Sequence, residues 1–217
     1  MKKIAIFQYD LSMGGIQKSL INLLSNFDKR NYEIDLYLFD NNNFFDKNID
    51  VNIIYLKKYP YFCRFIPFNL LKTITKKQVN KEYDIVIDFN SYSMECAVNA
   101  VKTKAKKKII WCHNDLEKKY ENDLKYRILW FFFKKKYNYF DEVVAVSEGA
   151  KESVINRLNI EKNKVKVIFD KRLLERNSRS MQFKKIDVQQ MLNVAADKFQ
   201  INGLEEFMLR GNIYGSK

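Results

Sequence analysis

The segment KIAIFQYDLSMGGIQKSLINLLSNFDKRNYEIDLYLFD, residues 3–40, decides the fold. Its first five residues form a short apolar run that predicts a buried strand. Two glycines follow, and apolar residues then recur at helical spacing over residues 16–27. The stretch at 33–39 alternates polar and apolar side chains, which is typical of a strand. A strand, a glycine turn, a helix and a second strand predict a βαβ unit with a parallel sheet.

The same alternation continues to residue 169. Further strands are predicted at residues 51–56, 83–89, 108–112, 142–147 and 164–169, and further helices at 68–80, 94–102, 123–139 and 148–157. Seven apolar strands alternating with helices predict an α/β fold, a Rossmann-like parallel sheet with helices on both faces. Ligands of such sheets bind beyond the carboxyl ends of the strands. The candidate loops therefore follow residues 7, 39, 89, 112 and 147.

The alternation stops near residue 170. We expect one domain over residues 1–169 and a helical or irregular tail over 170–217, with amphipathic helices at 186–199 and 204–209.

Composition excludes several classes of protein. Of the 217 residues 47% are hydrophobic, which is too many for a disordered chain, and 6 Gly and 2 Pro are too few for a collagen-like or proline-rich one. Cys63, Cys96 and Cys112 have no metal-ligand spacing, so we expect no metal site and a reducing, cytoplasmic compartment. No stretch approaches the roughly 18 apolar residues that span a bilayer.

The net charge of +13 is concentrated in two segments. Residues 57–80 carry no acidic side chain, and residues 102–110 add five lysines without an acid. The first segment also contains many aromatic residues. Its predicted membrane-facing residues are Lys57, Lys58, Arg64, Phe65, Lys72, Lys76 and Lys77.

A basic and aromatic segment has three interpretations. It suits an anionic membrane surface, where rings enter the interface and lysines meet head groups. It also suits nucleic acid, whose phosphates bind lysines and whose bases stack on rings. The third interpretation is a solvated lysine face over a packed helix. Because no known nucleic-acid-binding motif matches, a nucleic-acid partner is not expected.

Gly14 and Gly15 separate the first strand from the first helix. Glycines let backbone amides approach a ligand closely, and a helix N-terminus attracts anions, so a phosphate or diphosphate is the natural ligand. A plain turn would use the same glycines. The pattern matches neither the GxGxxG fingerprint nor a P-loop. Asp10 follows the same strand, where it would contact a ligand or form a turn.

His113 is the only histidine, and it directly follows the predicted strand at 108–112. An imidazole at this edge suits proton transfer or a hydrogen bond to a sugar hydroxyl, although it also suits an ordinary polar loop. Asp115 would orient it or cap the next helix, and Ser147 would also cap a helix. The acceptor or cleft candidates are Asp10, Lys18, Asn114, Asp115 and Ser147.

Taken in order, these segments resemble family 4 glycosyltransferases. The resemblance rests on residues 3–40, on YDIVIDF at 83–89, on KKKIIWCHND at 106–115, on FDEVVAVSEGAKESVINRL at 140–158 and on KVKVIF at 164–169. It implies one half of a GT-B fold, in which two Rossmann-like domains face each other across the active cleft. The N-terminal half mainly holds the acceptor, and the C-terminal half holds a nucleotide-sugar donor.

The resemblance also implies roles for individual residues. Gly14 and Gly15 would face the donor diphosphate, and His113 would line the cleft near the transferred sugar. The reaction would retain the anomeric configuration without a bound metal or other cofactor. The acceptor would be a lipid-linked saccharide of bacterial envelope or capsule synthesis, so we expect a cytoplasmic protein, peripheral on the inner face of the cell membrane.

The sequence departs from the family after residue 169. Family members continue with an Asn-Pro linker and a donor domain that carries two spaced glutamates, whereas residues 170–172 here are Asp, Lys and Arg. We therefore expect the donor-binding domain to be absent and the chain to be inactive alone or to need a separate donor-domain chain. The alternatives are a basic anion- or nucleic-acid-binding α/β module and a truncated, non-catalytic remnant.

Overall fold

The computed structural model describes residues 1–25, 30–44 and 49–168. The predicted tail and its two helices at 186–199 and 204–209 lie outside the described residues.

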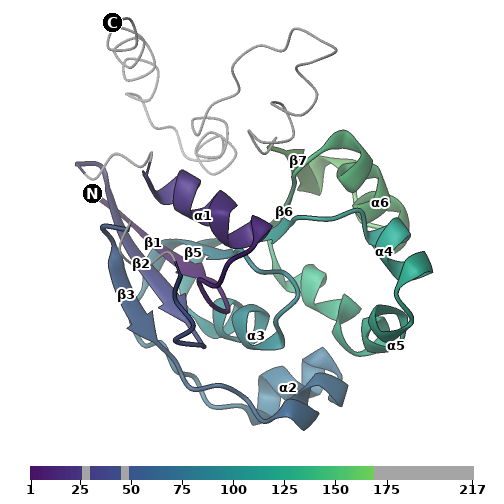
Figure 1. The fold of residues 1–217 in the computed structure, drawn as a ribbon, viewed down its shortest axis with the longest axis horizontal. Helices are drawn as coiled ribbons and strands as arrows, with labels where there is room; N and C mark the ends of the chain where they lie inside the picture. The colour runs from purple at the N-terminus through teal and green to yellow at the C-terminus, as the bar shows by residue number, and fades with distance from the viewer. Residues whose placement is uncertain (26–29, 45–48, 169–217) are drawn as a thin grey trace, which may run out of the picture.

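A seven-stranded parallel sheet forms the centre of the molecule (Figure 1). The strands are β1 (Lys2–Phe7), β2 (Tyr32–Leu38), β3 (Asn52–Tyr55), β4 (Tyr83–Asp88), β5 (Ala105–Cys112), β6 (Glu142–Ala145) and β7 (Val165–Val167). They lie in the order β3-β2-β1-β4-β5-β6-β7, and each pairs in parallel with its neighbours. The predicted fold class and all seven predicted strands are confirmed.

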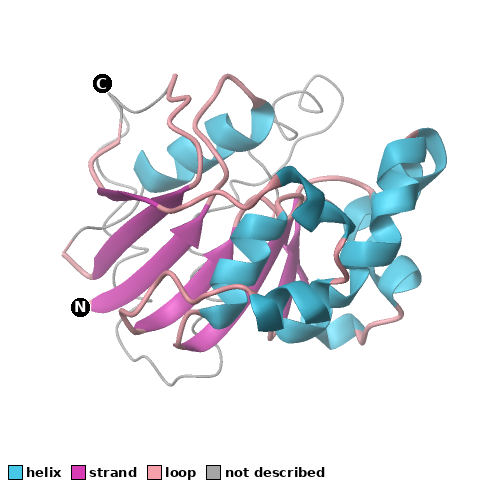
Figure 2. Cartoon of the chain, turned by 90° about the horizontal axis from the view of Figure 1, so that it is seen from below, coloured by secondary structure: helices cyan, strands magenta, loops and turns pink. Residues whose placement is uncertain are grey.

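Helices cover both faces of this sheet (Figure 2). They are α1 (Gly15–Ser25), α2 (Phe68–Ile74), α3 (Met94–Lys102), α4 (Leu116–Asn122), α5 (Leu124–Phe133) and α6 (Glu148–Leu158). Three 3₁₀ helices, η2 (Tyr61–Phe65), η3 (Lys134–Tyr139) and η4 (Lys162–Lys164), complete the described part.

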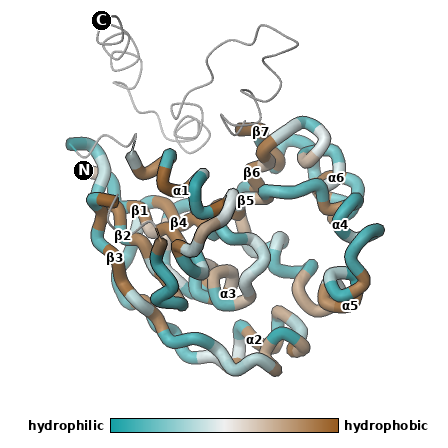
Figure 3. The backbone as a smooth tube through the Cα atoms, viewed as in Figure 1, coloured by the Kyte–Doolittle hydropathy of each residue, from teal (hydrophilic) through white to brown (hydrophobic). Residues whose placement is uncertain are grey.

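The core lies where the central strands are covered on both faces. Ile4, Ala5, Ile6 and Phe7 of β1 are all buried, which explains why this strand is apolar without alternation. Figure 3 shows the same hydrophobic character along the neighbouring strands.

The strand order reverses beside β1. The chain first extends the sheet from β1 through β2 to β3, and then crosses to the other side of β1 with β4. At such a switch point the loops after two adjacent strands diverge and leave a crevice at the carboxyl edge. Here those loops begin at Gln8 after β1 and at Phe89 after β4.

The helix predicted over 68–80 is six residues too long. It ends at Ile74, and Thr75 adopts an extended conformation with ψ 148°. Beyond it, the Gln78 side chain bonds the backbone N–H and C=O of Lys57, and Val79 is buried. These tertiary contacts require an extended chain, so they override the local helical pattern.

The helix predicted over 123–139 is divided. The α-helix ends at Phe133 and the chain continues as the tighter η3, which buries both Lys136 and Tyr137. A separate helix, α4, precedes it and begins after Asp115.

Candidate functional site

The loop after β1 is organised by Asp10. Its Oδ1 accepts hydrogen bonds from the backbone N–H of Ser12 at 3.1 Å, from the Ser12 hydroxyl at 2.8 Å and from Gln17 Nε2 at 2.8 Å. The predicted turn function of Asp10 is therefore observed. Its predicted ligand contact stays a prediction.

The local structure accounts for a glycine at position 14 and a glycine at position 15 in different ways. A Cβ on Gly14 would lie 2.3 Å from Oε1 of Gln17, the side chain that binds Asp10. A Cβ on Gly15 would meet no atom within 4 Å, because Gly15 opens α1 at an exposed position. Gly15 is thus an exposed residue at the amino end of α1, where a helix attracts anions, whereas Gly14 leaves room for the Gln17 side chain. Lys18 is exposed in the first turns of α1.

His113 lies directly beyond β5 and reaches across to the loop after β4. Its Nε2 is 2.7 Å from the carbonyl oxygen of Phe89, and its ring packs against the Phe89 ring at 4.7 Å between centroids. Because a carbonyl can only accept, Nε2 carries a proton, and Nδ1 is the basic nitrogen of the neutral ring. The imidazole therefore has one defined tautomer at the carboxyl edge.

The residues after His113 fix the adjacent loop. The Asn114 side-chain amide donates to the Tyr92 hydroxyl. Asp115 caps α4 by accepting from the backbone N–H groups of Glu117 and Lys118. In the same way Ser147 caps α6 by accepting from the Ala150 N–H. The predicted capping roles are observed, and the cleft roles of these residues stay predictions.

Buried polar groups at this edge were not singled out from the sequence. Gln8, directly after β1, is 0% exposed, and its side-chain atoms meet no hydrogen-bond partner among the described residues. Asp88 ends β4 and Lys136 comes from η3, and both are fully buried. Burial raises the pKa of Asp88 to about 6, against the opposing effects of Lys136 and of the Ser91 and Asn90 amides. A polar residue at the end of an apolar strand was the available signal for Gln8 and Asp88.

Comparison with known proteins identifies the family. The model of Glycosyltransferase Family 4 matches residues 13–169, which is most of the chain. The chain belongs to glycosyltransferase family 4. This confirms the resemblance seen in the sequence, and the matched region ends where the alternation of strands and helices stops.

Two solved structures of GT-B glycosyltransferases share the fold of this family 4 chain. The apo lipopolysaccharide outer core galactosyltransferase WaaB is 17% identical, with a TM-score of 0.50. HepE of Anabaena, solved in complex with UDP and glucose, is 15% identical, with a TM-score of 0.52. Each match covers 78% of this chain and 45% of the other, so the chain spans less than half the length of these structures. A search of curated proteins gives no match.

The two basic segments of the family 4 chain differ in their surroundings. In the second segment Lys104 pairs with Glu82 at 2.6 Å, Lys106 with Asp84 at 2.7 Å and Lys107 with Glu142 at 2.8 Å. These pairs lie where β4, β5 and β6 begin, at the edge opposite His113. Three of the five lysines of this segment are therefore compensated by carboxylates, and Lys102 and Lys108 donate to backbone carbonyls.

The positive charge of the first basic segment, residues 57–80, is balanced by fewer carboxylates. Among its six cations, Lys58 forms an ion pair with Asp40, whereas Lys57, Lys76 and Lys77 are exposed. Arg64 lies over the Tyr61 ring at 4.7 Å and Lys72 over the Tyr139 ring at 4.0 Å. The aromatic rings thus hold two of the cations at the surface.

Helix α5 extends this surface, which the sequence pattern did not indicate. It packs against η2, and Phe65 meets Phe132 edge-on at 6.1 Å. Three of its apolar side chains are exposed, Leu124 at 63%, Ile128 at 55% and Phe131 at 68%. Figure 3 shows α5 as a hydrophobic helix at the periphery. None of the helices in the described ranges is long and apolar enough to cross a membrane.

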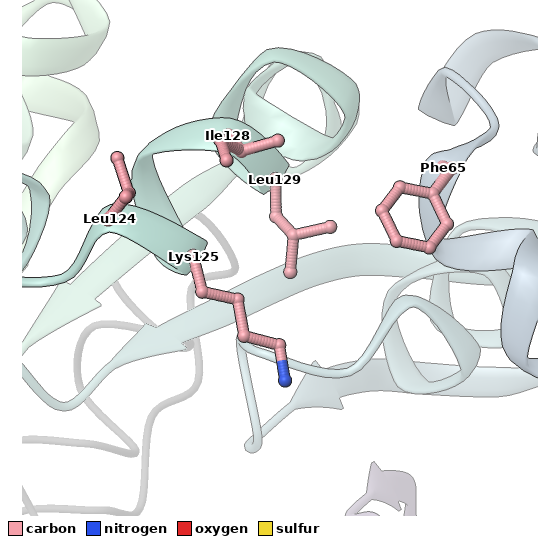
Figure 4. Close-up of a pocket in the computed structure, with 5 residues that line it drawn as sticks. All are labelled: Phe65, Leu124, Lys125, Ile128 and Leu129. Carbon is pink, nitrogen blue, oxygen red and sulfur yellow. The ribbon is translucent and has the colours of Figure 1, made fainter.

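A shallow apolar hollow of about 380 Å³ lies between α5 and η2. Figure 4 shows its lining, in which the Leu129 and Phe65 side chains approach each other and Lys125 extends from the same helix. The lining residues are Phe65, Leu124, Lys125, Ile128 and Leu129. We call the exposed face of η2, α2 and α5, including this hollow, the basic–apolar face.

The three cysteines lie in the core. Cys63, Cys96 and Cys112 are free thiols and all are buried. Burial raises the pKa of Cys112 to about 12, so it stays a thiol at neutral pH.

Proposed function

We propose that this chain is the acceptor-binding half of a retaining, nucleotide-sugar-dependent glycosyltransferase of bacterial envelope or capsule synthesis. The observation that carries the proposal is the carboxyl edge of the sheet in a family 4 chain. There Gly15 opens a helix that can receive an anion, and His113 is held in one tautomer next to the switch point.

The reaction breaks the bond between the anomeric carbon and the diphosphate, and forms a bond from that carbon to an acceptor hydroxyl oxygen. The hydroxyl proton leaves with the departing diphosphate. Negative charge grows on the diphosphate, and backbone amides at Gly14 and Gly15 would stabilise part of it. His113 would hydrogen-bond the transferred sugar through its imidazole.

The amides of Gly14 and Gly15 would supply only part of that stabilisation. In a GT-B enzyme, cations of the donor domain neutralise most of the leaving-group charge. We therefore propose that this domain transfers no sugar without a donor domain. We also propose that the chain is peripheral on the inner face of the cell membrane.

The acceptor would be a lipid-linked saccharide. The basic–apolar face supports this proposal, because α5 exposes apolar side chains and packs against η2, which carries Arg64. Lys57, Lys76 and Lys77 are further exposed cations of the same segment of the chain. Apolar groups that enter an interface and cations that meet anionic head groups are the two components of peripheral membrane binding.

The test uses the full chain, a set of labelled nucleotide sugars and vesicles that carry polyprenyl-diphosphate saccharides. We expect the Gly14 and Gly15 amide resonances to shift when nucleotide sugar is added, and no label to pass to the lipid. Transfer of label without an added donor domain would overturn the proposed need for one. Unchanged glycine amides at saturating nucleotide sugar would overturn the assignment of the phosphate site.

A nucleic-acid-binding module predicts a different result. Such a module would bind single strands tightly at physiological ionic strength, with an affinity that falls steeply as salt rises and does not depend on any saccharide. That outcome would replace the glycosyltransferase proposal.

A further inference from the structure

Lys136 is a buried lysine, and the local sequence does not explain its burial. Its neighbours Lys134 and Lys135 are exposed, whereas Lys136 is 0% exposed. The change from α5 to η3 at this point turns its side chain inward. A buried ammonium group is unfavourable unless it is compensated, and this one donates to the backbone carbonyl of Ser91.

Ser91 is bound at both of its backbone polar groups. While its C=O accepts from Lys136, its N–H donates to Asp88 Oδ1 at 3.1 Å. Its φ is 49°, in the left-handed region that a serine rarely adopts. Such a conformation persists only where the surroundings determine it, and here two buried charged groups do so.

The loop that contains Ser91 holds the two candidate residues after β5. Phe89, two residues before Ser91, provides the carbonyl that receives His113 Nε2–H at 2.7 Å. Tyr92, the next residue, provides the hydroxyl that binds the Asn114 amide. A change at Ser91 therefore reaches both contacts through one or two peptide units.

We propose that Lys136, acting with Asp88, is a positioning residue for the site: it locks the loop at 89–92 so that His113 keeps its Nε2–H tautomer. Lys136 contacts neither a reacting atom nor the imidazole. Its role in sugar transfer rests on the proposed function, but the positioning of the imidazole does not.

The test reads the imidazole directly in the full chain. Because His113 is the only histidine, its ring ¹⁵N and ¹H resonances need no separate assignment, and the ¹⁵N shifts tell a protonated ring nitrogen from an unprotonated one. Lys136→Met keeps an unbranched apolar side chain, one atom shorter, and removes the ammonium group. Lys135→Met is the matched control, since Lys135 is the exposed neighbour.

In Lys136→Met we expect the ¹⁵N chemical shifts of Nε2 and Nδ1 to move toward each other, because both neutral tautomers become populated. In Lys135→Met we expect the wild-type chemical shifts. If Lys136→Met does not fold, the variant Asp88→Asn/Lys136→Met removes both buried charges together and keeps an oxygen acceptor for the Ser91 N–H. The same tautomer mixing is expected there. Wild-type imidazole shifts in whichever of these variants folds would overturn the proposal.

The outcome is separable from that of the proposed function. Tautomer mixing in Lys136→Met supports the positioning role even if the chain binds no nucleotide sugar. Conversely, glycine amides that respond to nucleotide sugar, together with an unchanged imidazole in Lys136→Met, would overturn only the role of Lys136.

Discussion

The carboxyl edge carries some polar residues that are accessible and others that are deeply buried. His113 faces the edge through a ring whose tautomer is set by one backbone carbonyl. Behind it, Asp88 and Lys136 are buried and oppositely charged. Burial lowers the pKa of Lys136, and the Asp88 carboxylate opposes that effect. Burying these two charged groups therefore costs free energy of folding, as expected where a site must be kept in one geometry.

The raised pKa of Asp88 makes a testable contribution to stability. The folded chain holds this proton up to about pH 6, whereas an unfolded aspartate releases it near its ordinary pKa of about 3.9. The folded state therefore loses stability relative to the unfolded state as pH rises through this window, by about 3 kcal/mol. We expect the free energy of unfolding of Asp88→Asn not to show this fall with rising pH.

Urea unfolding of both proteins between pH 4 and pH 7 provides the measurement. The free energy of unfolding of Asp88→Asn minus that of the wild type should grow as pH rises. A difference that is independent of pH would mean that Asp88 is ionised throughout.

The two glycines should respond differently to alanine. In Gly14→Ala the new Cβ displaces the Gln17 side chain from Asp10, so one hydrogen bond is lost at a cost of about 1 kcal/mol. In Gly15→Ala the Cβ enters open space at the start of a helix, and stability should be unchanged or slightly higher. Unfolding curves of the two variants compare these costs. Equal destabilisation would show that the open space at Gly15 is not maintained in solution.

Secondary-structure elements show where sequence patterns suffice and where they fail. The strands were predictable because burial on both faces makes residues 4–7 and 85–87 continuously apolar, which is a local signal. The ends of α2 and α5 were not predictable. The first depends on Gln78 meeting Lys57 and the second on Lys136 reaching Ser91, and both contacts join distant parts of the chain.

Helix α6 depends on its N-cap. Ser147 Oγ accepts from the Ala150 N–H at 3.1 Å, and α6 packs against β6 and β7. We expect Ser147→Ala to lower the free energy of unfolding by about 1 kcal/mol, and Ser147→Asp to restore most of it. Chemical denaturation of the three proteins measures this. A wild-type value for Ser147→Ala would mean that the cap contributes nothing to stability.

Helix α5 should contribute to membrane binding through exposed apolar groups. We expect Ile128→Ser and Phe131→Ser to weaken binding to anionic vesicles by about tenfold or more each, because burial of such a side chain is worth about 1.5–3 kcal/mol. Tyr55→Ser is the matched control, since Tyr55 is 50% exposed and lies on β3 at the far edge of the sheet. Vesicle cosedimentation provides the measurement. Equal binding by all three variants would exclude α5 from the contact.

The whole molecule places its chemistry and its basic–apolar face on one Rossmann-like domain. The carboxyl edge of β1, β4 and β5 carries the candidate sugar-transfer residues, and η2, α2 and α5 carry the basic–apolar face. The family, the fold and the location of the edge could be predicted from sequence, because they follow from the order of strands and turns. The buried network behind His113 could not, since the sequence does not indicate which of three adjacent lysines turns inward.

The acceptor site is the central claim, and its most direct test compares two kinds of anionic vesicle. One carries a polyprenyl-diphosphate saccharide and the other the same polyprenyl diphosphate without sugar. The account predicts that the full chain binds the saccharide vesicles about tenfold more tightly, as one or two additional hydrogen bonds would allow. Asn114→Ala, a change at an acceptor candidate, should lose that increment, and Lys162→Gln, a change at an exposed lysine of η4, should keep it. Equal affinity of the wild-type chain for the two kinds of vesicle would contradict an acceptor site on this domain.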